Sequence, residues 1–90
     1  MYRLSTTRQF EKDYKLCKKR RYKLELLHNV ISQLEKSGHL PSNLKPHKLT
    51  GNYKGFWECH ILPDWLLIWL KDDVNSEITL TRTGTHSDLF

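Results

Sequence analysis

The pattern of apolar and polar positions predicts two helices in the first half of the chain. Residues 24–34 carry an apolar side chain every three or four positions, which is the spacing of an amphipathic helix, and Gly38 supplies its stop. A second apolar stripe precedes it, and Thr6 and Gln9 have the spacing of a capping box that would start that helix. The sequence YRLST before it is expected to form a short strand. The apolar positions are Phe10, Tyr14 and Cys17 in the first helix, and Leu24, Leu27, Ile31 and Leu34 in the second.

From residue 56 the period changes to that of strands. The stretch FWECHIL alternates, which places Cys59 on one side of a strand and Glu58 and His60 on the other. A turn at Pro63 leads into WLLIWL, whose unbroken apolarity predicts a central strand covered on both faces. The stretch DDVNS is expected to form a hairpin turn, and EITLTRT the last strand.

The predicted order β-α-α-β-β-β indicates an α+β fold, with two N-terminal helices packed on one face of a small, mainly antiparallel sheet. The 90 residues are expected to form a single domain, 1–90, because so short a chain buries only roughly 60–65 % of its unfolded surface. Residues 38–53 form a long irregular connection with two prolines and two glycines, and such loops are usually functional or disordered.

The formal net charge of +5 is unevenly spread along the chain. Residues 1–50 hold twelve basic and four acidic side chains, whereas residues 51–90 hold three basic and six acidic ones. A basic cluster at the end of the first helix favours a polyanionic partner, either nucleic acid or an acidic protein, over a merely solvated surface. Its members, expected to bind substrate, are Lys15, Lys18, Lys19, Arg20, Arg21 and Lys23.

A cytoplasmic location is expected. No run approaches the ~18–20 apolar residues that a membrane span needs, and the N-terminus lacks the apolar stretch of a signal peptide. Cys17 and Cys59 are interpreted as buried thiols in a reducing compartment rather than as a disulfide.

Five titratable or cationic residues could converge at one edge of the open sheet face: His47, His60, Asp64, Arg82 and His86. Such a group can cleave RNA without a metal. A base activates the 2′-hydroxyl, an acid protonates the 5′-leaving oxygen, and a cation stabilises the charge on the phosphorus centre. Imidazoles suit the proton transfers because they titrate near neutrality, and an arginine fork suits phosphate.

Arg82 poses a conflict, because strict alternation puts it on the same face as Leu80. Either a bulge re-aims its side chain, or that face is partly covered. A zinc site among the His and Cys residues lacks any C-x-x-C or H-x-x-x-H spacing, so no metal and no cofactor are expected. A Cys–His nucleophile is not supported either, since Cys59 points with the core residues. His28 and His39 are assigned to structure or solvent.

Three motifs in order, H-x-L-x-G from His47, C-H-x-x-P-D-W from Cys59 and R-T-G-T-H-x-x-L-F from Arg82, resemble the YafQ branch of the RelE/ParE superfamily of bacterial toxin–antitoxin ribonucleases. The resemblance implies a RelE-like fold and a ribosome-dependent endoribonuclease, an mRNA interferase silenced by a cognate antitoxin. The implied partners are the ribosome, mRNA and the antitoxin, with operator DNA bound only through the antitoxin complex. The family's catalytic roles fall on His47, His60, Asp64, Arg82 and His86; Trp65 and Phe90 would shape the substrate site, and Glu58 is a further candidate.

Two alternatives remain. A gyrase inhibitor of the same fold would need no proton-transfer cluster, so the three aligned histidines argue against it. A non-catalytic RNA- or protein-binding module would lose no activity when His86 is replaced.

Overall fold

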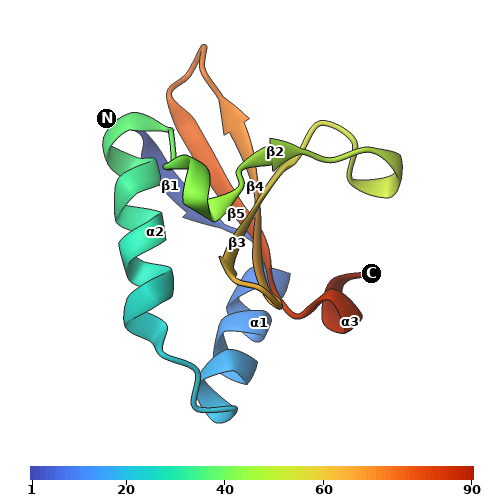
Figure 1. Cartoon of the computed structure of the whole chain (residues 1–90). Helices are drawn as coiled ribbons and strands as arrows, with labels where there is room; N and C mark the ends of the chain where they lie inside the picture. Colours follow the sequence, from blue (N-terminus) through green and yellow to red (C-terminus); the bar gives the residue numbers. More distant parts are fainter.

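The computed structural model describes residues 1–90 as one five-stranded sheet with helices packed against it (Figure 1). The strand order is β1-β5-β4-β3-β2; β1 pairs in parallel with β5, and the other neighbours are antiparallel. The predicted α+β class and order of elements are confirmed. The structure adds β2, α3 and two short 3₁₀ helices, Ser42–Leu44 and Gly51–Tyr53. The strands are β1 (Arg3–Thr6), β2 (His47–Lys48), β3 (Trp57–Leu62), β4 (Trp65–Asp72) and β5 (Glu77–Gly84); the helices are α1 (Arg8–Lys19), α2 (Leu24–Ser37) and α3 (His86–Leu89).

Helix α1 begins one residue later than the capping motif predicts. Its N-cap is Thr7, whose hydroxyl oxygen accepts a hydrogen bond from the backbone N–H of Phe10 at 2.9 Å. Thr6 is the last residue of β1 and its hydroxyl is directed to a different partner, so the predicted capping box between Thr6 and Gln9 is wrong. The strand and the helix therefore meet with no intervening loop.

Helix α2 ends where the sequence predicts. Gly38 adopts a left-handed conformation with φ of 75°, and its N–H bonds to the carbonyl of Leu34. A Cβ at this position would lie 2.5 Å from the ring of Tyr2, so both the backbone and the packing require glycine. None of the helices combines the length and the apolar composition that crossing a bilayer requires.

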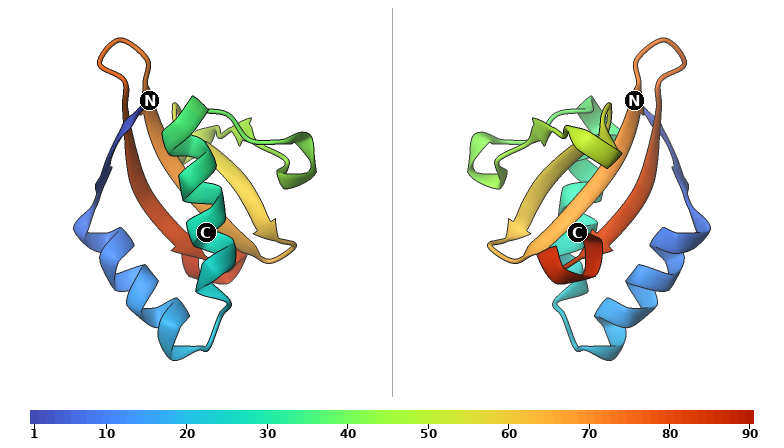
Figure 2. Two further views of the ribbon diagram at one scale, coloured as in Figure 1. Left: turned by 90° about the vertical axis from the view of Figure 1, so that its left-hand side faces the viewer. Right: turned by 90° about the vertical axis from the view of Figure 1, so that its right-hand side faces the viewer.

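Both α1 and α2 pack on the same face of the sheet, and α2 crosses that face diagonally (Figure 2). The apolar stripes predicted from the helical spacing point into this interface. Asp13 interrupts the stripe of α1 as a buried charged residue. The core under the helices consists of Phe10, Cys17, Leu27, Val30, Leu34, Cys59, Ile61, Trp65, Leu67, Trp69, Ile78 and Leu80.

The opposite face of the sheet has a smaller apolar cluster of its own. In Figure 1, the segment that follows β2 and the helix α3 lie across the sheet from α2. They cover Leu66 and Ile68 of β4, so all five residues from Trp65 to Trp69 are buried. The prediction of a central strand covered on both faces is therefore confirmed. The covering side chains are Leu49, Tyr53, Phe56 and Leu89.

A β-bulge in β5 resolves the conflict over Arg82. Leu80 pairs with Trp69, but Arg82 pairs with Ile68, so Thr81 is an extra residue between them. Paired residues in an antiparallel sheet share a face, and an extra residue reverses the alternation. Leu80 accordingly stays in the helix-covered core, whereas Arg82 turns to the second face. The first of the two solutions considered from the sequence, a bulge that re-aims the side chain, is therefore confirmed.

Candidate active site

The strand register aligns several predicted site residues on the second face of the sheet. His47 on β2 is opposite Glu58 on β3, which is opposite Ile68 on β4, which in turn is opposite Arg82 on β5. His60 lies two residues further along β3 and therefore shares this face. A row of side chains thus crosses four strands, although the residues come from distant parts of the sequence.

Glu58 is a buried carboxylate between two imidazoles. It is 5 % exposed, its Oε1 lies 3.2 Å from Nε2 of His47 and 3.9 Å from Nε2 of His60, and its Oε2 has no hydrogen-bond partner. The ring of His47 also contacts the carbonyl oxygen of Lys45 through Nδ1, at 2.8 Å. A carbonyl only accepts, so the proton of the neutral ring is on Nδ1, and Nε2 faces the carboxylate of Glu58.

The ring of His60 also contacts a backbone carbonyl through Nδ1. Its Nδ1 lies 3.4 Å from the carbonyl oxygen of Pro63, which favours the proton on Nδ1 and leaves Nε2 as the nitrogen able to accept one. The side chain is one quarter exposed, so solvent or a substrate can reach it. If the ring gains a proton, the carboxylate of Glu58 is close enough to stabilise the charge.

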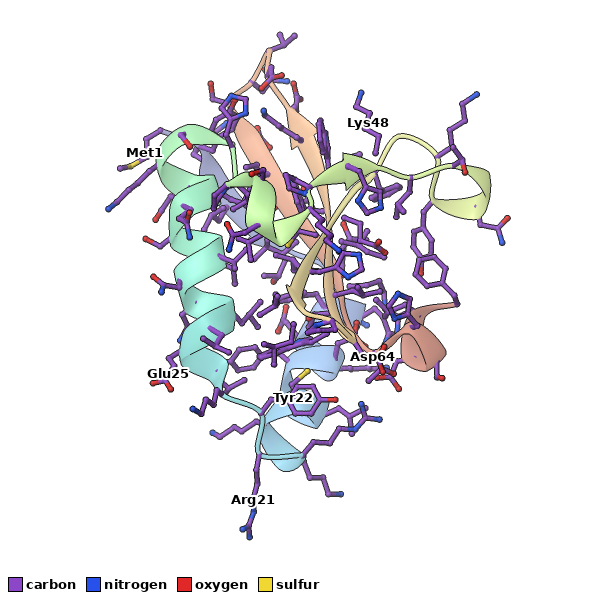
Figure 3. The ribbon with its side chains drawn as sticks, in the orientation of Figure 1. Met1, Arg21, Tyr22, Glu25, Lys48 and Asp64 are labelled. Atoms are coloured by element: carbon purple, nitrogen blue, oxygen red, sulfur yellow. The ribbon has the colours of Figure 1, made fainter.

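Asp64 and His86 form the most direct polar contact of the face. Oδ1 of Asp64 accepts from the backbone N–H of His86 at 2.9 Å and from its ring Nδ1 at 2.6 Å. These two bonds, the backbone one first, hold the pKa of the Asp64 carboxyl below its ordinary value. Since Nδ1 is committed to Asp64, Nε2 is the ring nitrogen available for proton exchange. Figure 3 shows Asp64 beside α3, which carries His86.

The three imidazoles form a continuous row. The ring centres of His47 and His60 are 6.1 Å apart, and those of His60 and His86 are 5.8 Å apart. That spacing places two proton-transfer groups on either side of a single small group such as a phosphate.

Arg82 is held by a carboxylate from α1. Its Nε donates to Oδ2 of Asp13 at 2.8 Å and its Nη2 to Oδ1 at 3.1 Å, and the backbone N–H of Thr83 donates to the same Oδ2 at 3.2 Å. The bond to Asp13 is the main reason that the pKa of Arg82 is raised, so the guanidinium is permanently charged. One edge of the fork is thereby fixed by Asp13, and Tyr53 makes a smaller contribution to the raised pKa.

The C-terminal residues close one side of the face. Leu89 is buried in the second apolar cluster, whereas Phe90 is 65 % exposed and its ring lies 5.5 Å from that of Tyr53 in an edge-on arrangement. Phe90 is thus fixed by an aromatic neighbour and still presents a free surface on which a base could stack.

Trp65, which is predicted to help shape the substrate site, does not lie on the second face. The side chain is 2 % exposed and lies on the helix-covered face, where its ring is 4.9 Å from that of Tyr22. Its Nε1 donates to Oγ1 of Thr83 at 3.0 Å, and that hydroxyl donates to the carbonyl of Leu66 at 2.7 Å. Trp65 therefore ties β4 to β5 from behind the site.

A family model described as the bacterial toxin YafQ of type II toxin–antitoxin systems matches residues 2–90. The chain belongs to the YafQ family of toxins. It is 37% identical over 83 residues to the mRNA interferase toxin YafQ of Escherichia coli K12, and the match covers 91% of this chain and 88% of that protein.

Solved structures of relatives share the whole fold. A chain of the E. coli DinJ–YafQ complex matches with a TM-score of 0.90 at 34% identity, over 100% of this chain and 99% of that one. A metal-bound toxin from Helicobacter pylori matches with a TM-score of 0.90 at 37% identity, over 100% of both chains. The predicted membership in this family is therefore confirmed.

The metal-bound relative does not imply a matching site in this YafQ-family toxin. No group of three or more His, Cys, Asp or Glu side chains is arranged to hold a metal ion. Cys59, one of the ligand types weighed from the sequence, is buried on the helix-covered face, where burial raises the pKa of its thiol to about 12. No step proposed below uses a metal.

The basic cluster divides into free and paired members. Arg20 forms an ion pair with Asp88 of α3, with Nη1 and Oδ2 only 2.6 Å apart. The others are exposed on the second half of α1 and at the α1–α2 turn, where Figure 3 shows Arg21 pointing away from the molecule. These free members are Lys15, Lys18, Lys19, Arg21 and Lys23.

Asp13 is the site residue that sequence reasoning missed. It lies three residues after Phe10 and four before Cys17, so it interrupts the apolar stripe of α1. A carboxylate at a buried helical position needs a cationic or N–H partner. The acidic residue within the apolar stripe could therefore have predicted a buried ion pair.

Replacing Asp13 by Asn should destabilise the protein. The neutral amide has one acceptor oxygen, so it cannot accept all three bonds from Arg82 and Thr83 as the carboxylate does. Because a buried donor would lose its partner, the free energy of unfolding should fall by about 1–3 kcal/mol. Urea unfolding of D13N measures this. Glu25, an exposed carboxylate at the start of α2, provides the control, and E25Q should stay within about 0.5 kcal/mol of the parent. Equal effects of the two substitutions would contradict the assignment.

Proposed function

We propose that this protein is an mRNA interferase, the toxin of a type II toxin–antitoxin system, which cleaves RNA by metal-independent acid–base catalysis. The observation that carries the proposal is the pair of neighbouring rings of His60 and His86, beside a charged arginine on the same sheet face. Nδ1 of His60 is engaged by a neutral carbonyl and Nδ1 of His86 by a carboxylate, so both Nε2 atoms remain available. The curated relative of 37% identity is an mRNA interferase, which supports the same reaction class.

In the proposed reaction, His60 accepts the proton of the 2′-hydroxyl through Nε2. The 2′-oxygen then attacks phosphorus, and the bond from phosphorus to the 5′-oxygen breaks. Asp64 is a weaker candidate for the base, because the two hydrogen bonds from His86 lower the pKa of its carboxyl. Glu58 is positioned to stabilise the imidazolium that forms on His60.

His86 supplies the proton to the leaving 5′-oxygen. Its Nδ1–H is donated to Asp64, whose negative charge stabilises a protonated ring, and its Nε2–H is the proton to be delivered. The side chain is 53 % exposed, so an RNA backbone can approach it. The products are a 2′,3′-cyclic phosphate, or the phosphate that opens from it, and a 5′-hydroxyl.

Arg82 and His47 complete the site. Arg82 binds the scissile phosphate through the part of its guanidinium that Asp13 does not occupy. His47, which lies beside Glu58, orients or stabilises that phosphate. Phe90 offers its exposed ring for stacking on a base of the message.

The proposed function also implies three partners: the ribosome, an antitoxin and, through the antitoxin, operator DNA. The free basic residues at the α1–α2 turn bind ribosomal RNA phosphates, so cleavage depends on the ribosome. A cognate antitoxin, by analogy with the DinJ–YafQ complex, inhibits the toxin by covering basic or active-site surface, and operator DNA is contacted only through that complex. The protein acts in the cytoplasm, where messages are translated.

Replacing His86 by Ala should reduce single-turnover cleavage of a ribosome-bound message by about 10²–10⁴, the usual contribution of one positioned acid–base group. His39 is an exposed histidine remote from the site, and H39A should retain the parental rate. Thermal unfolding of both variants should match the parent, because exposed imidazoles contribute little to stability. Unimpaired cleavage by H86A would favour a non-catalytic binding module instead.

Neutralising Lys18 and Lys19 together should weaken ribosome binding. Loss of two phosphate contacts should also reduce the slope of log affinity against log salt by about 1.4–1.8, because fewer counterions are released. The matched control neutralises Lys36 and Lys45, two exposed lysines outside the cluster. An unchanged slope in the first variant, measured by ribosome co-sedimentation over a salt series, would rule out this interface.

A further inference from the structure

The helix that carries His86 is too short to stand alone. Helix α3 has four residues, fewer than an isolated helix needs to persist in water. Its position must therefore come from contacts with the rest of the protein. Leu89 anchors its apolar side in the second cluster, and Asp64 contacts its first residue.

A third anchor comes from the end of α1. The guanidinium of Arg20 meets the carboxylate of Asp88 with two bonds, from Nη1 to Oδ2 at 2.6 Å and from Nη2 to Oδ1 at 3.1 Å. This fork-to-fork geometry fixes direction as well as distance. Arg20 and Asp88 are 68 positions apart in the sequence, so the contact joins the end of α1 to the C-terminal helix α3.

Asp88 transmits this anchor to the start of α3. The same carboxylate accepts the backbone N–H of Thr85 at 2.9 Å, and the hydroxyl of Thr85 accepts the N–H of Asp88 at 3.1 Å, which completes a capping box. Arg20 first, and the N–H of Thr85 second, hold the pKa of Asp88 far below its ordinary value. Thr85 directly precedes His86, so the carboxylate of Asp88 fixes the backbone position from which the side chain of His86 extends.

Gly84 leaves the room that this carboxylate needs. A Cβ at position 84 would lie 2.8 Å from Oδ2 of Asp88, the oxygen that meets Arg20. The turn between β5 and α3 therefore needs glycine at position 84 to leave space for the carboxylate of Asp88.

We propose that Arg20 and Asp88 are positioning residues that hold His86 in its place against Asp64, and that Arg20 serves this purpose rather than RNA binding. The inference rests on the proposed function, in which His86 moves a proton. An ion pair with partly exposed members adds little to global stability, so its effect falls on the geometry of the short helix. Misplacement of a reacting group by about 1 Å costs up to about 10²-fold in rate.

The experiment compares R20Q with R21Q. Both remove one positive charge from adjacent positions of the basic cluster, but only Arg20 has a carboxylate partner. R20Q should lower the single-turnover rate at saturating ribosome by about 10- to 100-fold, whereas R21Q should change only the affinity. D88N should be similarly slow, and R20Q/D88N no slower than D88N, because the two residues act through one contact.

A second readout does not depend on activity. In R20Q the NMR-measured pKa of the Asp64 carboxyl should rise toward its ordinary value, because His86 no longer holds both hydrogen bonds to it. In R21Q that pKa should not move. Thermal unfolding of R20Q should stay close to that of R21Q, which separates a local displacement from general destabilisation.

The outcomes separate this inference from the proposed function. If H86A is inactive while R20Q cuts as fast as R21Q, the positioning role of Arg20 and Asp88 is wrong and the proposed function stands. If H86A cuts normally, the proposed function fails, and the titration of Asp64 still decides whether Arg20 places His86. An Asp64 pKa that is the same in R20Q and in the parent would overturn the inference.

Discussion

The burial of β4 on both faces is the constraint on which the site depends. Leu66 and Ile68 project away from the helices, and water contact with these side chains would be unfavourable. The chain removes them from water with two separate segments, one that carries Leu49 and another that carries Leu89. His47 and His86 lie two and three residues before these apolar anchors. The same burial that completes the second layer of the core therefore brings two imidazoles to the edge of β3, where His60 lies.

Carboxylates then orient the basic groups. Asp13 fixes one edge of Arg82, Asp64 holds Nδ1 of His86, and Glu58 lies between His47 and His60. Each acid is placed where it can set the proton position or the direction of a cation, so one sheet face holds groups prepared for different roles. Asp88 extends the pattern outward, since it joins Arg20 to the turn before His86. In the mechanism proposed here, the reacting groups are imidazoles and the carboxylates hold them.

The sequence predicted what local patterns determine. The stripe of α2, its stop at Gly38 and the apolar run of β4 all depend on neighbours within a few positions, and all are confirmed. The two-residue β2 and the four-residue α3 are too short to show a period, so they could not be read from the pattern. The partners Asp13 and Arg82 are 69 positions apart, and no local signal joins them. That Trp65 packs on the helix-covered face could not be predicted either, because its motif identifies a position in the family but not a face of the sheet.

Attack by the 2′-hydroxyl is the central chemical claim, and the fate of a substrate without that group tests it most directly. A ribosome-bound message with one 2′-deoxy nucleotide at the cut site should resist cleavage there, because the nucleophile is missing and His60 has no proton to accept. The matched ribonucleotide message should be cut to an upstream fragment ending in a cyclic or opened phosphate and a downstream fragment with a 5′-hydroxyl. Mass spectrometry of the fragments distinguishes these ends. Efficient cutting of the deoxy message, or a 5′-phosphate on the downstream fragment, would contradict the account.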